Sequence, residues 1–267
     1  MMKHLPIKCQ NIIAEAAEIS GYLWEKGWAE QNGGNFSIDV SGIVPADLIN
    51  ESASEVLFPV SQPELAGRSF LVKIAGARMR EVARQPEKHV LLIHIHTDLR
   101  GYSILWGGDR DSRPTSEFIS HLKIHQFLQQ QQRSEKVFLH THPMHLIALS
   151  QIREYCQEEQ MNRILFSMHP EVSIYVPDGI GLAPYRCPGS PELADVTVLA
   201  LAHHRAVLWE KHGCAAIGNS LSEAFDLIDI LEKAAHLFFI CQTSGFHPEG
   251  LSRNCLEEIS RKYGSRI

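Results

Sequence analysis

Histidines spaced two residues apart are the part of this sequence best suited to chemistry. The chain has 15 histidines among 267 residues, and imidazole is the commonest metal ligand in proteins. His140 and His142 lie in the segment LHTHP, and residues i and i+2 of a strand point to the same face. A catalytic zinc ion takes three protein ligands, with histidine nitrogens at ~2.0–2.1 Å, and keeps an open position. His212, in the segment WEKHGC, lies where a predicted strand meets Gly213 and is a candidate third ligand.

The same spacing occurs at a second place, so residue pattern alone does not select between two pairs. His94 and His96 also lie on a predicted strand, and both pairs can be ordinary strand histidines with partners inside the sheet. Context favours His140 and His142, because Pro143 follows them and ends their strand. His94 and His96 lie in the middle of theirs.

Two further histidine pairs are weaker candidates. His121 and His125 have the i,i+4 spacing of one helix face, but their segment lacks the glutamate of the HExxH zinc motif. His203 and His204 are adjacent in a predicted helix, where neighbouring side chains point apart. Local pattern therefore leaves the choice of metal site open.

Polar residues at two turns could serve acid–base chemistry and an anionic ligand. Glu117 lies in a predicted first helical turn, where the helix dipole favours a carboxylate by ~0.3–1 kcal/mol, and it could also transfer a proton. Thr115 and Ser116 could present helix N–H groups to an anion or simply cap the helix. A glycine turn is predicted at Asn32, Gly33, Gly34 and Asn35. It could bind an anion through its side-chain amides and backbone, or it could be a plain β-turn.

Hydrophobic periodicity predicts that helices and strands alternate along the chain. Helical spacing is expected over residues 10–26, 113–131, 150–167, 195–204 and 220–245. Strand-like segments are expected over 32–40, 70–76, 89–98, 101–108, 136–143, 173–185 and 206–218. This alternation favours a sheet covered by helices on both faces, in one domain over residues 1–267.

Composition excludes several classes of protein. The net charge is −6 with a sequence pI near 6.2, and no basic block occurs, so we expect no nucleic-acid partner. No apolar run reaches the length of a membrane span, and the N-terminal segment lacks a secretion signal, so we expect no membrane partner and a cytoplasmic location. Six scattered cysteines without a CxxC pair indicate reduced thiols.

Four short motifs, in this order, are similar to those of a known family. NGGN at 32–35, RPTSE at 113–117, LHTHP at 139–143 and WEKHG at 209–213 resemble the class II aldolase/epimerase/adducin-head family, from about residue 10 to residue 245. The resemblance implies an α/β fold, a three-layer α/β/α sandwich around a largely antiparallel central sheet, assembled as a homotetramer.

The resemblance also implies a functional site. His140, His142 and His212 would bind one Zn²⁺ per subunit, and Glu117 would be the catalytic carboxylate. Glu171 would be a second acidic residue, contributed to the site of a neighbouring subunit. The phosphate of a small sugar substrate would be bound by Asn32, Gly33, Gly34, Asn35, Thr115 and Ser116. One departure is Ala75-Gly76-Ala77-Arg78, which lacks the hydroxyl that the family commonly uses for phosphate.

The implied reaction is retro-aldol cleavage, which leaves negative charge on the ketone half of the substrate. A lysine Schiff base or a divalent metal must absorb that charge, and Lys73, Lys123 and Lys211 are interpreted as ordinary surface or strand-end residues. The 70 positions between His142 and His212 suit the branch that cleaves L-rhamnulose 1-phosphate to dihydroxyacetone phosphate and L-lactaldehyde. The alternatives are another sugar-phosphate aldolase, a pentulose-phosphate 4-epimerase, a non-catalytic adducin-like module and an unrelated zinc hydrolase.

Overall fold

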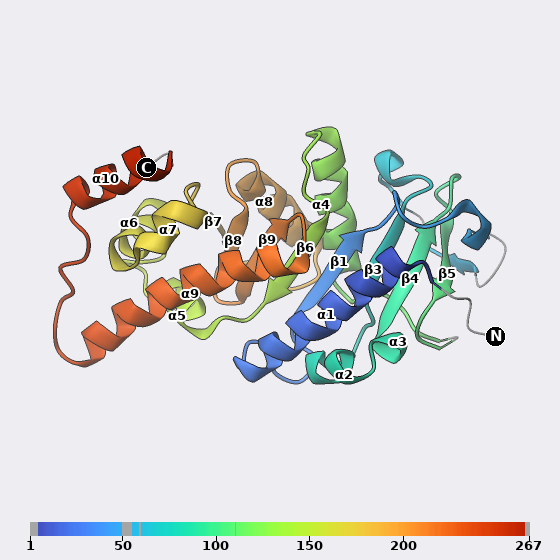
Figure 1. Cartoon of the computed structure of the whole chain (residues 1–267), viewed down its shortest axis with the longest axis horizontal. Coiled ribbons are helices and arrows are strands. Elements are labelled where there is room, and N and C mark those ends of the chain that lie inside the picture. Colours follow the sequence, from blue (N-terminus) through green and yellow to red (C-terminus); the bar gives the residue numbers. More distant parts are fainter. Residues whose placement is uncertain (1–4, 50–54, 59, 110, 265–267) are drawn as a thin grey trace.

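The computed structural model describes residues 5–49, 55–58, 60–109 and 111–264 (Figure 1). The strands are β1 (Asn35–Asp39), β2 (Glu55–Leu57), β3 (Ser69–Lys73), β4 (Val90–Ile95), β5 (Gly101–Trp106), β6 (Val137–Thr141), β7 (Ile180–Ala183), β8 (Ala206–Trp209) and β9 (Gly213–Gly218). The α-helices are α1 (Ile7–Glu25), α2 (Met79–Arg84), α3 (Pro86–His89), α4 (Phe118–Gln130), α5 (Met144–Gln151), α6 (Glu158–Met168), α7 (Pro170–Tyr175), α8 (Pro191–Leu201), α9 (Leu221–Thr243) and α10 (Arg253–Tyr263). Two 3-10 helices, η1 (Ala46–Leu48) and η2 (Pro63–Leu65), lie in loops.

The strands of the described chain form one sheet in the order β2-β5-β4-β3-β1-β6-β9-β8-β7. Neighbouring strands are antiparallel except for β7 and β8, which are parallel. The central strand β1 pairs with β3 on one side and β6 on the other, so Asn35 lies opposite His140. This pairing brings the glycine turn before β1 next to the histidine motif at the end of β6.

Alternation along the central strands separates two hydrophobic layers. In β6, Val137 and Leu139 belong to the core that α1 and α9 cover, whereas Phe138 belongs to the core that α4 and α8 cover. Successive strand residues point to opposite faces, so each face of the sheet acquires its own helical layer. Figure 1 shows α1 and α9 crossing the same face. The predicted three-layer sandwich around a largely antiparallel sheet is confirmed.

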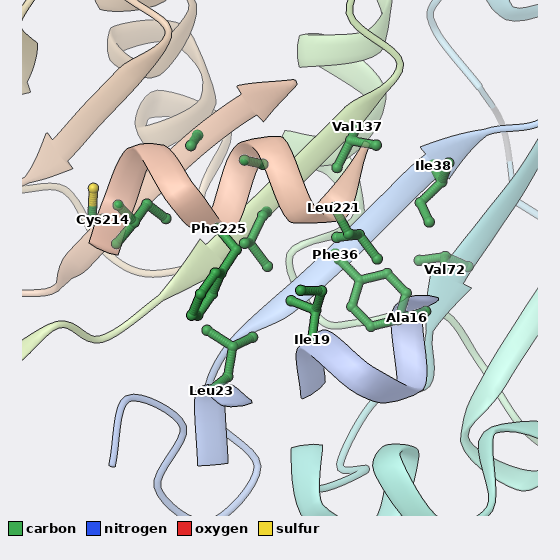
Figure 2. Close-up of a cluster of buried hydrophobic side chains, with 14 of the residues drawn as sticks. Ala16, Ile19, Leu23, Phe36, Ile38, Val72, Val137, Cys214, Leu221 and Phe225 are labelled. Atoms are coloured by element: carbon green, nitrogen blue, oxygen red, sulfur yellow. The ribbon is translucent and has the colours of Figure 1, made fainter. Parts of the chain in front are cut away.

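Two helices close the larger core over the strands that carry the site (Figure 2). Ala16, Ile19 and Leu23 lie on the buried face of α1, at the i, i+3 and i+7 spacing of an amphipathic helix. Leu221 and Phe225 approach the same strands from α9. Each fully buried large apolar side chain contributes roughly 1.5–3 kcal/mol, so these contacts hold β1 and β6 firmly in register.

Three predicted elements have different bounds in the structure. The helix expected over 150–167 is two helices, because Ile152 leaves helical backbone geometry at the end of α5. The segment 173–185 contains the end of α7, which Pro170 starts at its first helical position, before β7 begins. The fourth helix begins at Phe118 rather than at Thr115 and Ser116. Among the described residues, no helix combines the length and apolarity that crossing a bilayer requires.

Candidate metal centre and substrate site

His140 has a buried, unprotonated nitrogen at the end of β6. Its Nδ1 lies 3.0 Å from the carbonyl oxygen of Cys214, and because a carbonyl only accepts, Nδ1 carries the proton. The lone pair is therefore on Nε2, which is buried without a hydrogen-bond partner among the described residues. Burial, followed by the nearby rings of His142 and His212, holds the pKa of His140 well below its ordinary value. The ring stacks on Trp209 at 4.1 Å and stays neutral.

His142 lies one residue past the end of β6, where its backbone N–H donates to the carbonyl of Trp28 at 2.9 Å. Its Nδ1 lies 2.7 Å from a carboxylate oxygen of Glu30, so the N–H is on Nδ1 and Nε2 remains available as a ligand. A carboxylate in this position orients a metal-bound imidazole and raises its basicity.

His212 completes the group from the turn between β8 and β9. Its backbone N–H donates to the carbonyl of Trp209 at 3.0 Å, and its buried Nδ1 has no hydrogen-bond partner in the described part of the chain. Burial, helped by the His142 ring, lowers the pKa of His212 to about 4. One ligand atom from each of the three histidines lies within 4.8 Å of the others. Neutral imidazoles with unbonded nitrogens are the donors that a zinc ion requires.

Two glycines allow the backbone to close around these rings. A Cβ on Gly213 would lie 2.7 Å from Cε1 of His140 and 2.6 Å from the carbonyl of Thr141. A Cβ on Gly33 would lie 2.9 Å from Cε1 of His142. A Cβ atom essentially never lies within 3.0 Å of such an atom. The NGGN turn beside His142 and the chain directly after His212 therefore require glycine at positions 33 and 213, respectively.

Glu117 lies beside the histidines, at the N-cap of α4. Its Oε2 is 4.0 Å from Nε2 of His140 and accepts a 2.6 Å hydrogen bond from Nδ2 of Asn35. Burial raises the pKa of Glu117, against the lowering effects of Asn35, His142 and Lys73. A buried carboxylate with a raised pKa next to a candidate metal is suited to proton transfer.

Lys73 is also part of this region, and its burial contradicts its interpretation as an ordinary surface or strand-end residue. It does end β3, but it is 2% exposed, and its ammonium group donates to the carbonyl of Asn32 at 3.0 Å. Burial lowers its pKa to about 8, although Glu117 and Glu81 act in the opposite direction. Local sequence did not reveal this, because the turn that covers Lys73 comes from a distant segment. The local sequence offers one signal for a role of Lys73 in anion binding. Lys73 directly precedes the loop that lacks the hydroxyl group the family commonly uses for phosphate.

Two of the predicted anion-binding residues, Asn32 and Thr115, contact Lys73, but the predicted residues do not all offer free donors. The Thr115 N–H donates to the carbonyl of Lys73 at 2.9 Å, and its hydroxyl accepts from the Glu117 N–H at 3.4 Å. Ser116 and Asn32 are exposed. The glycine turn and the loop before α4 therefore adjoin, as the predicted site requires.

Glu171 is not brought to the three histidines within this chain. It lies on α7, which packs against α6, α9 and α10. Its Oε2 lies 2.9 Å from Nδ1 of His169, and 43% of the side chain is exposed. In the described residues, no interaction joins Glu171 to the histidine cluster.

The competing pair, His94 and His96, is hydrogen-bonded to serine side chains of the sheet. Nδ1 of His94 lies 2.9 Å from the hydroxyl of Ser69, and Nε2 of His96 lies 2.8 Å from the hydroxyl of Ser103. Both rings are 3% exposed. The sequence left open that a His-x-His pair consists of ordinary strand histidines with partners inside the sheet. The serine contacts of His94 and His96 fit that interpretation rather than a pair of metal ligands.

Comparison with known proteins places this geometry in a family. The profile described as class II aldolase and adducin N-terminal domain matches residues 14–239, most of the chain. The chain belongs to the class II aldolase family. The predicted resemblance is confirmed. Because the chain belongs to this family, it is not a member of an unrelated family of zinc hydrolases.

Relatives within the class II aldolase family are similar over nearly their whole length. A rhamnulose-1-phosphate aldolase of Bacteroides thetaiotaomicron is 38% identical over 250 residues, covering 93% of this chain and 92% of the relative. One of Listeria welshimeri is 31% identical, covering 91% and 87%. A sugar-phosphate aldolase structure from Thermotoga maritima has a TM-score of 0.73 at 32% identity, covering 91% of this chain and all of that one. An L-fuculose-1-phosphate aldolase from Thermus thermophilus, at 19% identity and a TM-score of 0.55, shares the fold.

Proposed function

We propose that this chain catalyses the metal-dependent retro-aldol cleavage of L-rhamnulose 1-phosphate to dihydroxyacetone phosphate and L-lactaldehyde. The observation that carries the proposal is a cluster of three imidazoles with a buried carboxylate, Glu117, 4.0 Å from one of them. The relatives from Bacteroides and Listeria carry rhamnulose-1-phosphate aldolase activity in their names and support the choice of substrate.

His140, His142 and His212 would hold one Zn²⁺ per subunit. All three donors are nitrogens, which suit zinc, whereas magnesium and calcium prefer oxygen. A bound ion would supply Lewis-acid stabilisation of the negative charge that develops on the ketone half of the substrate, an effect worth several kcal/mol. Glu30 keeps the ring of His142 in its ligating tautomer through the 2.7 Å contact at Nδ1.

Glu117 moves the proton that the reaction requires. In cleavage the C4 hydroxyl of the sugar loses its proton and becomes the aldehyde carbonyl as the C3–C4 bond breaks. The electron pair of that bond is left on C3 of the ketone half, which must then gain a proton. Because burial raises the pKa of Glu117, its acid form persists closer to neutrality, where general acid catalysis contributes ~10²–10⁴-fold. In the reverse direction, the ionised carboxylate removes the same proton from dihydroxyacetone phosphate.

Lys73 supplies the positive charge for the substrate phosphate. Its ammonium lies against the Asn32 carbonyl, at the entrance to the glycine turn. The loop after β3 has no hydroxyl, and the N–H groups of Ala75 and Ala77 already bond to Arg113 and Ile74. A lysine at this position offsets those missing donors, since hydrogen bonds to charged groups contribute about 1.5–3 kcal/mol.

The proposal includes the assembly that the family resemblance implies. The chain is one domain over residues 1–267, in a cytoplasmic homotetramer in which Glu171 reaches the site of a neighbouring subunit. The partly exposed side chain of Glu171 is consistent with a role outside its own chain. Light scattering with wild type and Glu171→Gln would report the oligomer, and kinetics would report whether the carboxylate acts in cleavage.

Product identification tests the reaction directly. The metal-loaded protein should release dihydroxyacetone phosphate from L-rhamnulose 1-phosphate and lose this activity after chelation. L-fuculose 1-phosphate and L-ribulose phosphates, assayed side by side, discriminate the sister activities. Faster turnover of either would replace the proposed substrate, and absence of cleavage with equimolar bound metal would contradict the function.

The lowered pKa of Lys73 favours one competing mechanism, in which a Schiff base replaces the metal as the acceptor of charge. Borohydride reduction in the presence of dihydroxyacetone phosphate distinguishes the two. The proposed mechanism predicts no added mass on Lys73 and full activity after removal of the reagent. A covalent adduct at Lys73 would assign the charge to the amine instead.

A further inference from the structure

A continuous row of buried hydrogen bonds leads from Glu117 into the protein interior. Asn35 bonds to Glu117 and also to His121, whose Nε2 lies 2.6 Å from Asn35 Oδ1. The other ring nitrogen of His121 lies 2.7 Å from the hydroxyl of Ser37, and that hydroxyl lies 2.7 Å from Nε2 of His125. None of these hydrogen bonds was expected from the sequence, which gave His121 and His125 only as a pair on one helix face.

The row exists because a helix and a strand have matching repeats. His121 and His125 are one helical turn apart on α4, a rise of about 6 Å. Asn35 and Ser37 are two residues apart on β1, a rise of about 6.7 Å. The two pairs therefore interlock, and the carboxylate at the N-cap of α4 lies at one end of the same row.

The direction of every hydrogen bond in the row is determined. The Glu117 carboxylate accepts, so the Asn35 amide must turn its NH₂ group toward it and its oxygen toward His121. Nε2 of His121 must then donate, and its Nδ1 must accept from the Ser37 hydroxyl. The oxygen of Ser37 in turn accepts from Nε2–H of His125. Each group donates in one direction only.

The environment keeps this direction fixed. His121 is 0% and His125 is 2% exposed, and burial lowers the pKa of both rings, to about 4 for His125. A protonated His121 would donate from both nitrogens and reverse the Ser37 hydroxyl, so neutrality is required. Phe138 packs edge-on against His121 at 4.8 Å, which restrains the ring.

We infer that Ser37, His121 and His125 are positioning residues that fix the orientation of the Asn35 amide and, through it, of the Glu117 carboxylate. A flipped amide would present its oxygen to the carboxylate, and two acceptors repel. With Oε2 held by Asn35, Oε1 is the oxygen that carries the proton to and from the substrate. This inference rests on the proposed role of Glu117.

Solvent exchange of dihydroxyacetone phosphate measures the proton transfer alone, without the aldehyde. In D₂O, the metal-loaded enzyme breaks one C–H bond at C3, passes the proton to Glu117 and returns deuterium, which NMR detects. Ser37→Ala should slow this exchange about tenfold or more, since misplaced groups of this kind cost up to ~10²-fold. Its KM and metal content should equal those of wild type.

Ser69→Ala is the matched control. Ser69 is a strand serine, 1% exposed like Ser37, and it also bonds to a buried histidine, His94. Its exchange rate should stay within about twofold of wild type, because Ser69 bonds to His94, which lies outside the row that ends at Glu117. Equal rates in Ser37→Ala and Ser69→Ala would overturn the inference. A wild type that exchanges nothing would instead contradict the proposed function.

Nitrogen NMR of the histidine side chains tests the row independently of activity and metal. At pH 7, His121 and His125 should both be neutral with the proton on Nε2. Ser37→Ala should leave the fold intact and mix the two tautomers of His121. A wild-type His121 that is protonated, or that carries its proton on Nδ1, would overturn the inference.

Discussion

The two His-x-His strand pairs of this protein have the same local sequence form and opposite environments. His94 and His96 each bond to a serine hydroxyl of the sheet, at 2.9 and 2.8 Å. His140 bonds to a carbonyl through Nδ1 and leaves Nε2 buried without a partner in the described residues. A buried polar nitrogen without a hydrogen-bond partner destabilises the fold by about 1–3 kcal/mol. Binding of a ligand to that nitrogen would compensate for this loss. The availability of hydrogen-bond partners, rather than residue spacing, distinguishes the structural pair from the candidate ligand pair.

The largest expected effect separates the two pairs by metal binding. His142→Ala should lose bound zinc and at least ~10³-fold of the cleavage rate, since the ion supplies several kcal/mol of stabilisation. His96→Ala should retain one zinc per chain, although it leaves a cavity in the sheet. Elemental analysis of both purified variants, alongside cleavage rates, makes the measurement. Equimolar zinc in His142→Ala would remove the distinction.

Glu117 tests whether the His140 pair serves catalysis as well as metal binding. Glu117→Gln keeps the shape and can still accept from Asn35, so zinc content and the unfolding midpoint should match wild type. Turnover should fall ~10²–10⁴-fold, the range for loss of a general acid. A variant with nearly normal turnover and normal zinc would disprove the assignment of proton transfer.

Lys73 is expected to affect substrate binding without affecting metal. Lys73→Met should raise KM for the sugar phosphate by about 10–100-fold, because a hydrogen bond to a charged group contributes about 1.5–3 kcal/mol. Lys123→Met is the matched control, since Lys123 pairs with Asp195 at 2.6 Å on the surface. Steady-state kinetics of the two variants give the comparison. Similar KM values in both would place the phosphate elsewhere.

The helical pair His121 and His125 provides the smallest expected effect, on stability. Burial lowers the pKa of His125 to about 4, below its ordinary value of 6.5. The folded state thus resists protonation more than the unfolded chain, so its stability is full above pH 6.5 and is lost as pH falls toward 4. For His125 the loss from pH 8 to pH 5 is roughly 2 kcal/mol. Urea unfolding should show a smaller pH dependence in His125→Gln, and an unchanged one would contradict the shift.

Sequence patterns predicted much of the fold because the determinants of each element are local. Helical spacing at Ala16, Ile19 and Leu23 predicts α1, and apolar runs bounded by turn residues predict β3, β4 and β6. The bounds of α5, α6 and α7 were less predictable. There, departures from helical geometry depend on how the chain packs after each turn rather than on composition.

The candidate site shows where local information ends. The spacing of His140 and His142 was visible, but the serines that satisfy His94 and His96 come from β3 and β5, beyond any local motif. Only the family resemblance decided between the two pairs. The burial of Lys73 depends on sheet pairing, because β3 adjoins β1 and the turn that precedes it.

X-ray absorption of the zinc-loaded protein tests most directly whether His140, His142 and His212 share one ion. The predicted spectrum shows one zinc per chain with three imidazole nitrogens at ~2.0–2.1 Å, and one fewer imidazole in His142→Ala if any metal remains. A wild-type spectrum with thiolate ligands, or with fewer than three imidazoles, would contradict the proposed metal centre.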